Sequence, residues 1–185
     1  MKTDKQYIYQ FELDLEEIAK GSCLSRSAVE HIMRDGRAIS RFSEAWVERI
    51  YGGLKLNPVN HKGSDCTGVK ESYYSVKSLT KNGSALRLSS NSGKGRTCSE
   101  KDVMDFILQN TQHIFVDNVR LPSIRIIALN SGVLVRWSYS GRLRKETGII
   151  SHKDFWEAEE VKSRSTILLD PCFTEGSVTF VARKM

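Results

Sequence analysis

The sequence predicts an α/β fold, with a mixed and mostly antiparallel sheet flanked by helices and preceded by an N-terminal helical region. Three observations support this prediction. Aromatic and β-branched residues alternate over residues 73–77 and indicate a strand. Apolar residues at helical spacing mark a helix over residues 42–50. Strand-like segments return in the second half, at residues 113–116, 123–129 and 132–139.

The composition is that of a globular protein with a moderate excess of positive charge. The 185 residues suffice for one sizeable core. The chain has 28 Lys and Arg against 22 Asp and Glu, a net charge of +6, which favours a polyanionic partner without proving one. No apolar run approaches the ~20 residues of a membrane span, and no signal peptide opens the chain. The cysteines form no CxxC pair, so we expect neither zinc nor disulfides, and a cytoplasmic location.

Residues 1–39 are predicted to be a helical region. Apolar residues from Ile8 onward continue to Lys20, and Gly21 and Ser22 then interrupt the pattern. Ser27 begins a capping-box sequence that leads into a second helix. The expected result is a pair of helices ahead of the main domain.

Residues 15–32 within this region resemble a helix-turn-helix. Ala19 stands at the position of tight helix contact, and Cys23 replaces the glycine usual in the turn. The resemblance implies that Leu24, Val29 and Ile32 are buried. It also implies that the second helix faces DNA. The alternative is an ordinary helical hairpin that packs on the core or forms a dimer contact. The residues assigned to DNA by the resemblance are Ser25, Arg26, Ser27 and Glu30.

A predicted β-hairpin over residues 61–77 is the feature around which the rest is organised. Because side chains alternate along a strand, Tyr73, Ser75 and Lys77 share one face. Asp65 is then expected beside Ser75 and Lys77 across the hairpin. A carboxylate next to a lysine suits metal-assisted phosphodiester hydrolysis, since the carboxylate holds a divalent ion and the lysine orients or deprotonates water. The alternative is an ordinary hairpin whose edge lysine discourages aggregation.

Residues 42–78 resemble the PD-(D/E)xK nucleases, and among them the small type II restriction endonucleases. The resemblance implies a restriction-endonuclease-like core over residues 40–185 and Mg²⁺-dependent cleavage of double-stranded DNA at a specific sequence. It further implies a homodimer and a companion DNA methyltransferase. Two residues depart from the family pattern. Ser64 stands where proline is frequent, and Ser75 stands where Asp, Glu or Gln is usual.

The resemblance also implies an acid from the preceding helix. Glu44 and Glu48 lie one turn apart there, and Glu44 matches the family pattern better. The implied metal ligands are Glu44, Asp65 and the backbone carbonyl of Val76. A solvated Glu pair partnered by arginine is the alternative, and Glu71 and Glu100 are weaker candidates for the missing acid. The predicted buried stripe of this helix consists of Phe42, Ala45, Trp46 and Ile50.

Two basic segments are the predicted DNA contacts. Residues 89–97 form a glycine-rich stretch containing Lys94 and Arg96, without the GK[ST] ending of a phosphate-binding P-loop. Residues 132–145 are predicted to form a hairpin, and a two-stranded ribbon fits the DNA major groove. A solvated linker and a solvated hairpin tip are the alternatives. The hairpin residues assigned to DNA are Arg136, Tyr139, Arg142, Arg144 and Lys145.

The remaining elements complete the predicted fold. Ser99 and Ser151 are expected to cap two further helices, and residues 166–169 and 178–182 to form the last strands. Two other functions compete with restriction. One is a non-catalytic helix-turn-helix DNA-binding regulator with a nuclease-like fold, which the serine at position 75 favours. The other is a nuclease that acts on DNA junctions.

Overall fold

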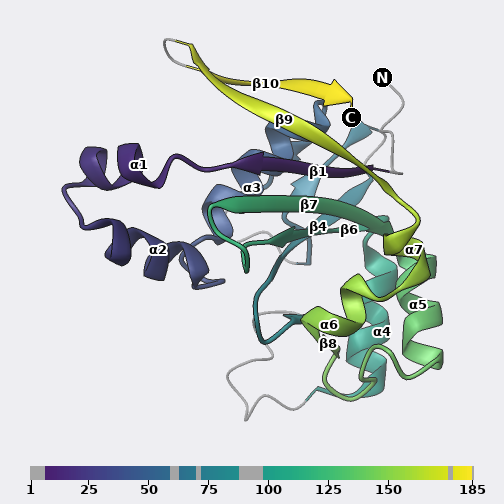
Figure 1. The fold of residues 1–185 in the computed structure, drawn as a ribbon. Helices are drawn as coiled ribbons and strands as arrows, with labels where there is room; N and C mark the ends of the chain where they lie inside the picture. The colour runs from purple at the N-terminus through teal and green to yellow at the C-terminus, as the bar shows by residue number, and fades with distance from the viewer. Residues whose placement is uncertain (1–6, 59–62, 70–71, 88–97, 175–176, 185) are drawn as a thin grey trace.

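The computed structural model describes residues 7–58, 63–69, 72–87, 98–174 and 177–184 (Figure 1). Within these residues the helices are α1 Leu15–Ser22, α2 Arg26–Arg34, α3 Ser40–Tyr51, α4 Glu100–Gln109, α5 Ser131–Tyr139, α6 His152–Trp156 and α7 Glu159–Lys162. The strands are β1 Tyr7–Glu12, β2 Lys55–Leu56, β3 Cys66–Thr67, β4 Tyr73–Leu79, β5 Ser84–Ala85, β6 Gln112–Asp117, β7 Ser123–Asn130, β8 Ile149–Ile150, β9 Ser165–Thr174 and β10 Ser177–Lys184.

An eight-stranded sheet in the order β10-β9-β1-β7-β6-β4-β3-β2 forms the centre of the molecule. The β1–β9 and β4–β6 pairs are parallel, and the other neighbours are antiparallel. The predicted α/β class, with a mixed and mostly antiparallel sheet flanked by helices, is therefore confirmed. In the described part of the chain, no helix is long and apolar enough to cross a membrane.

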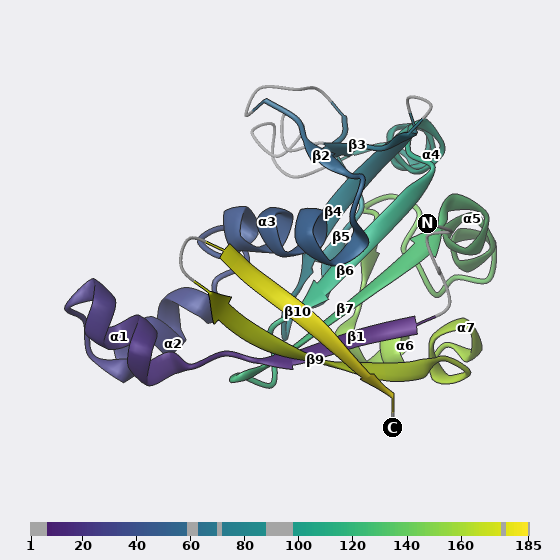
Figure 2. The ribbon, with the colours of Figure 1, turned by 90° about the horizontal axis from the view of Figure 1, so that it is seen from above.

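Hydrophobic side chains cover both faces of the sheet. Figure 2 shows α3 on one face and α4 to α7 on the other. Along β6 the side chains alternate between the two layers, since Ile114 and Val116 pack on the α3 side and Phe115 packs on the α4 to α7 side. The crossover from β4 to the parallel β6 runs through α4, as a parallel connection requires. One edge of β4 consequently lies between the two helical layers.

The N-terminal prediction is wrong for residues 7–12, which form a strand rather than a helix. Ile8 packs with the α4 to α7 layer and Phe11 with the α3 layer, as expected for an odd spacing on a strand. The helix begins at Leu15, after Asp14 caps it. Because β1 lies between β9 and β7, residue 39 does not separate an N-terminal helical unit from the rest.

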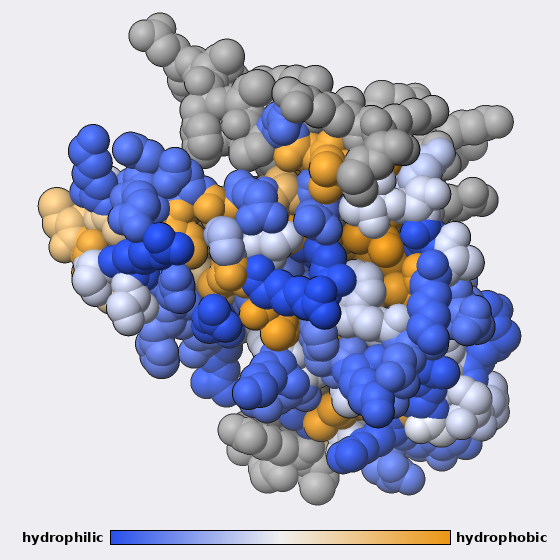
Figure 3. Space-filling view, viewed as in Figure 1, coloured by the Kyte–Doolittle hydropathy of each residue, from blue (hydrophilic) through white to orange (hydrophobic). Residues whose placement is uncertain are grey.

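The α1–α2 pair forms as predicted and projects beyond the sheet (Figure 1). Cys23 adopts the left-handed conformation, with φ of 56°, that glycine would supply in the turn. The cap of α2 is Ser25 rather than Ser27, since its hydroxyl accepts from the Ala28 N–H. Leu24 is 44% exposed and Ile32 is 39% exposed, so their predicted burial is wrong. Figure 3 shows apolar surface at the tip of this pair.

The predicted strand over residues 132–139 is also wrong, because α5 occupies it. The buried residues Val133, Leu134 and Trp137 follow helical spacing, although β-branched and aromatic residues suggested a strand. Asn130 caps the helix through its side chain, which accepts from the Val133 N–H at 3.0 Å. A DNA-reading ribbon therefore does not exist here. The predictions of strands at residues 113–116 and 123–129 and of helices after Ser99 and Ser151 are confirmed.

Helix α3 is confirmed, but the side that it buries differs from the predicted stripe. Its buried residues are Ser43, Val47 and Tyr51, while Phe42 is 50% exposed. Phe42 packs instead along the outer side of Trp46, with ring centroids 6.1 Å apart. This difference brings Glu44 next to the buried face, because Glu44 lies one turn before Val47.

Candidate active site

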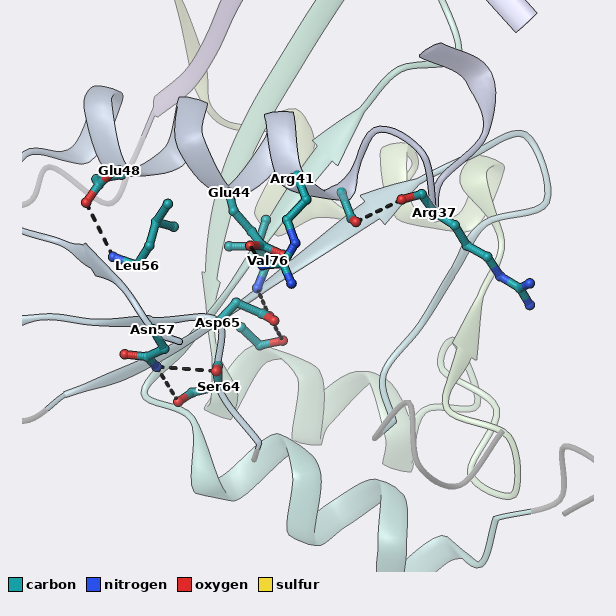
Figure 4. Close-up of polar contacts among 11 residues, drawn as sticks. Arg37, Arg41, Glu44, Glu48, Leu56, Asn57, Ser64, Asp65 and Val76 are labelled. Carbon is teal, nitrogen blue, oxygen red and sulfur yellow. Dashed lines mark hydrogen bonds and ion pairs between the residues drawn. The ribbon is translucent and has the colours of Figure 1, made fainter. Parts of the chain in front are cut away.

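A cleft of about 880 Å³ opens at the edge of β4. Strand β3 pairs only with Tyr73 and Tyr74, so this edge of β4 has no strand neighbour from residue 75 onward among the described residues. Three segments supply the walls. They are the α2–α3 turn with the start of α3, the loop that carries Asp65, and the turn between β4 and β5. Figure 4 shows the polar contacts within this cleft.

Asp65 takes the place that a continued β3 would occupy. Its N–H donates to the Tyr74 carbonyl at 2.9 Å, as in a strand pair. Its Oδ2 accepts from the Val76 N–H at 2.6 Å and from the Ser75 hydroxyl at 3.1 Å. Oδ1 makes no hydrogen bond with a described residue. The predicted placement of Asp65 beside Ser75 is confirmed, and the carboxylate is fixed with one oxygen left for another ligand.

A network of amides fixes the loop that carries Asp65. The Asn57 side-chain amide donates to the Ser64 hydroxyl at 3.0 Å, and its Oδ1 accepts from the Thr67 hydroxyl at 2.7 Å. From α4, the Asn110 amide donates to the Gly63 carbonyl at 3.0 Å. Gly63 has φ of 90°, a conformation that L side chains rarely adopt. The loop is therefore held both by residues next to β2 and β3 and by the end of α4, which limits the motion of Asp65.

Glu44 reaches the cleft from α3 and lies deep within it. Its side chain is 13% exposed, and its Oε2 lies 2.7 Å from Arg41 Nη1. Burial raises the pKa of Glu44, and the charge of Asp65 raises it further, although Arg41 opposes both effects. Glu44 and Asp65 thus repel each other across the cleft, an arrangement that a bound cation would relieve.

Glu48 points elsewhere, which separates the two candidate acids of α3. Its Oε1 accepts from the Leu56 N–H at 3.3 Å, well away from the carboxylate of Asp65 in Figure 4. Glu48 therefore fixes β2 to α3. Of the weaker candidates, Glu100 forms an ion pair with Lys145 at 3.2 Å and does not line the cleft, so its suggested metal role is wrong. Glu71 lies outside the described residues.

Lys77 lines the same cleft from β4. Burial lowers the pKa of its ammonium, and the charges of Asp65 and Glu44 partly oppose that shift. The ammonium lies 4.7 Å from the centre of the Phe106 ring, a cation–π contact that replaces part of its hydration. A lysine with a lowered pKa gives up its proton more readily, so Lys77 is suited to exchange a proton with a substrate or water.

His113 forms the buried wall behind Ser75, its partner in the β4–β6 pair. Burial lowers the pKa of His113 to about 4, and the positive charge of Lys77 lowers it too. Nε2 lies 3.1 Å from the Ile107 carbonyl, and Nδ1 has no hydrogen-bond partner among the described residues. The imidazole is therefore neutral near pH 7 and adds no second positive charge beside Lys77.

The oxygen ligands in the cleft suit Mg²⁺ but are few. In the described residues, no group of three His, Cys, Asp or Glu side chains is placed to hold a metal ion. This agrees with a serine, rather than an acid, at position 75. Glu44 and Asp65 supply two carboxylates, and Val76, which also lines the cleft, carries a backbone carbonyl. Mg²⁺ prefers oxygen ligands and keeps several waters, so such a set fits it.

Most of the residues predicted to contact DNA lie outside the cleft, and several of them contact other residues of the protein instead. Arg136 lies 3.4 Å from Glu160 in an ion pair, Arg142 donates to the Asp154 carbonyl, and Lys145 lies 5.1 Å from the centre of the Tyr139 ring. These contacts arise because α5 and the loop after it replace the predicted ribbon. Arg144 is exposed on that loop, away from the cleft.

The other predicted DNA contacts have two different outcomes. Arg26 on α2 lies between two acids, 2.8 Å from Glu16 and 3.3 Å from Glu30. Lys94 and Arg96 lie outside the described residues. The positive charge of Arg26 is therefore already paired with acids on α1 and α2.

Sequence reasoning missed the basic residues that do line the cleft. Their positions in or beside two turns, one before α3 and one after β4, are the signal that could have found them. Both turns flank the segments that carry Glu44 and Lys77 and are therefore brought to the same edge of the sheet. The cations that line the cleft besides Lys77 are Arg34, Arg37, Arg41 and Lys81.

Comparison with known proteins adds no assignment to this geometry. No family model matches the chain, and no curated protein or solved structure gives a significant match. The cleft itself is therefore the feature that indicates a function.

Proposed function

We propose that this protein is a Mg²⁺-dependent endonuclease of the PD-(D/E)xK type that cleaves double-stranded DNA at a specific sequence. The observation that carries the proposal is the convergence of Glu44, Asp65 and Lys77 in one cleft, from a helix, a loop and a strand. Arginines and a lysine line the same cleft. Partly buried acids next to a lysine, surrounded by cations, suit a phosphodiester better than a neutral substrate.

The residues of the cleft divide the reaction among themselves. Asp65, Glu44 and the Val76 carbonyl would hold the metal ion, which when bound polarises the phosphoryl oxygen and makes its water more acidic. The neutral amine form of Lys77, which its lowered pKa favours, would accept the proton of the attacking water as the new P–O bond forms and the bond to the leaving oxygen breaks. The Ser75 hydroxyl and Val76 N–H keep Asp65 in position throughout. Solvent supplies the proton to the leaving oxygen.

We further propose that the enzyme acts as a homodimer in a restriction-modification system with a companion DNA methyltransferase. Two copies related by two-fold symmetry would give each DNA strand one active site. The α1–α2 pair, with Leu24 and Ile32 exposed at its surface, is the candidate for the dimer contact or for a second DNA contact.

Incubation with phage DNA, with and without Mg²⁺, tests the proposal. Discrete fragments that require Mg²⁺ support restriction, and a smear indicates a non-specific nuclease. Asp65→Ala and Lys77→Ala should each lower the cleavage rate by about 100-fold or more, with unchanged circular dichroism. Cleavage by either variant at the wild-type rate would show that this cleft is not the active site.

The alternative is a non-catalytic DNA-binding regulator that uses α1 and α2. The formation of this pair, with the left-handed turn at Cys23, favours it. The engagement of Arg26 by Glu16 and Glu30 counts against it. Intact DNA with a shifted mobility in the same assay would support the regulator. The protein would then bind DNA through α1 and α2 without cutting it.

A further inference from the structure

We propose that Arg37 and Lys81 form a phosphate-binding pair that holds the DNA backbone beside the bond to be cleaved. The inference rests on the proposed nuclease function and names the part of the cleft that positions its substrate. Arg37 belongs to the α2–α3 turn and Lys81 to the turn between β4 and β5. Both residues line the cleft that contains Glu44 and Asp65.

Close packing fixes the two turns against each other. The Ser78 hydroxyl donates to the Gly36 carbonyl at 3.1 Å. A Cβ atom added to Gly36 would lie 3.0 Å from Thr80 Cγ2, so the backbone of one turn approaches the other as closely as a glycine allows. Arg37 and Lys81 directly follow Gly36 and Thr80 in the sequence. The fold therefore brings two cations from separate elements to one wall.

Neither of these cations is neutralised by an ion pair within the described chain. Arg37 and Lys81 are exposed, and their side chains make no hydrogen bond or ion pair with a described residue. The other arginines that line the cleft are engaged, since Arg34 lies 3.8 Å from Glu30 and Arg41 lies 2.7 Å from Glu44. Two like charges held near each other repel, and a polyanion would reverse that effect.

Asp35 is the acid beside this pair, and the structure assigns it another role. Its Oδ1 accepts from the Arg37 N–H at 2.7 Å and from the Ala38 N–H at 3.2 Å. These two backbone hydrogen bonds lower the pKa of Asp35 and shape the turn before α3. Asp35 interacts with the Arg37 charge but forms no ion pair with the guanidinium.

The geometry suits a phosphate neighbouring the reacting one. Figure 4 shows the Arg37 side chain extending away from Glu44 and Asp65. Arginine offers a planar set of donors for phosphate oxygens, and lysine acts as a compact charge. A strand that places one phosphate at the carboxylates would pass the next phosphates along this wall. Arg37 and Lys81 are therefore positioning residues, which act in binding rather than in bond cleavage.

Fluorescence anisotropy with a labelled DNA duplex, in a metal chelator so that no cleavage occurs, tests the pair. The variants are Arg37→Ala with Lys81→Ala, and Arg37→Lys alone. We expect the double variant to bind about 10-fold more weakly and to lower the slope of log affinity against log salt by about two. Arg37→Lys keeps the charge and should retain that slope. The matched control, Lys101→Ala with Arg120→Ala, removes the same charges from exposed positions outside the cleft.

Two outcomes would contradict the proposed phosphate-binding role of Arg37 and Lys81. One is an unchanged affinity and salt slope in the double variant. The other is an equal loss in the control variant, which would show that only net charge matters. Cleavage assays run in parallel keep this result separate from the proposed function. If Asp65→Ala loses cleavage while the Arg37/Lys81 double variant binds DNA as the wild type does, the nuclease function is supported and the role of the Arg37–Lys81 pair is rejected. Normal binding by the wild type without any Mg²⁺-dependent cleavage would instead reject the nuclease.

Discussion

The cleft at β4 and the surface formed by α5 to α7 both carry several cations, but they differ in how those cations are paired. On the α5 to α7 surface, Arg136 forms an ion pair with Glu160, and Arg142 donates to the Asp154 carbonyl. In the cleft, Arg37 and Lys81 have no such partner among the described residues. Counting basic residues along the sequence therefore pointed to the α5 to α7 surface rather than to the cleft. Pairing, which depends on the fold, identifies the candidate DNA contact.

The acids of the two regions also differ in how completely their oxygens are hydrogen-bonded. Asp117 lies below the α5 to α7 layer, and its carboxylate contacts Arg125, His152 and the Val119 N–H. These three donors satisfy both of its oxygens, as in a structural network. Glu44 and Asp65 have three donors between the two of them, and Asp65 Oδ1 has none in the described chain. Incomplete satisfaction of buried charge is typical of functional sites, because a ligand completes it.

The largest expected effect that tests this difference between the two regions is a fall in the free energy of unfolding at acidic pH. His113, buried on β6 behind Ser75, has a pKa of about 4, below the ordinary value of 6.5. Above pH 6.5 both folded and unfolded states hold a neutral imidazole. As the pH falls from 6.5 to 4, only the unfolded state takes up the proton, so the free energy of unfolding should fall by roughly 3 kcal/mol.

Urea denaturation across this pH range would measure that loss. His113→Gln removes the group and should flatten the dependence, even though it also lowers stability at pH 7. His31→Gln, at an exposed position on α2, is the matched control and should leave the dependence as in the wild type. A steep loss of stability in His113→Gln would show that other groups are responsible.

Local patterns predicted the core of the candidate site well because its parts are close in sequence. Alternation placed Asp65 beside Ser75, and the helix of Glu44 directly precedes that hairpin. The α5 helix was misread because its valines and aromatic residues have high β-propensity, while the Asn130 cap and packing against Phe155 and its neighbours favour the helix. The Arg37–Lys81 pair depends on contact between Gly36 and Thr80, which no local pattern contains.

The second effect separates the two acids of α3. Glu44→Gln keeps the shape but removes a charge from the cleft, so at limiting Mg²⁺ it should lower cleavage by at least about 10-fold, or about 1.4 kcal/mol. Higher Mg²⁺ or Mn²⁺ should partly restore activity. Glu48→Gln is the matched control and should have little effect on cleavage, because Glu48 contacts the Leu56 N–H instead. The reverse pattern would mean that Glu48 is the metal ligand.

The same variant has a second, opposite consequence for stability. The pKa of Glu44 is raised by burial, so the folded state favours the protonated form. Below the ordinary pKa of glutamate, the wild type and the Glu44→Gln variant should therefore have similar stability. As the pH rises through the raised pKa, the wild type loses stability relative to Glu44→Gln. Thermal unfolding at acidic and neutral pH would show whether the cleft keeps this acid at a cost in stability.

The smallest expected effect belongs to the α5 to α7 surface. A base-reading ribbon would make Arg142→Ala and Arg144→Ala lose roughly 1–3 kcal/mol of sequence discrimination. The helix and loop found there lead us to expect a change in DNA affinity below about 0.5 kcal/mol, as for ordinary surface substitutions. Arg142→Ala should lower the free energy of unfolding by about 1 kcal/mol, because its hydrogen bond to the Asp154 carbonyl is lost.

Binding of matched and mismatched duplexes by these two variants would decide between the surfaces. Arg144 is the sharper probe, since it is exposed and its backbone, rather than its side chain, contacts Ile149. A selective loss of discrimination in Arg144→Ala, with Arg37 and Lys81 intact, would assign the sequence specificity of the proposed nuclease to the α5 to α7 surface. An unchanged preference would confine DNA recognition to the cleft and to elements outside this surface, because a charge that touches no base cannot distinguish one sequence from another.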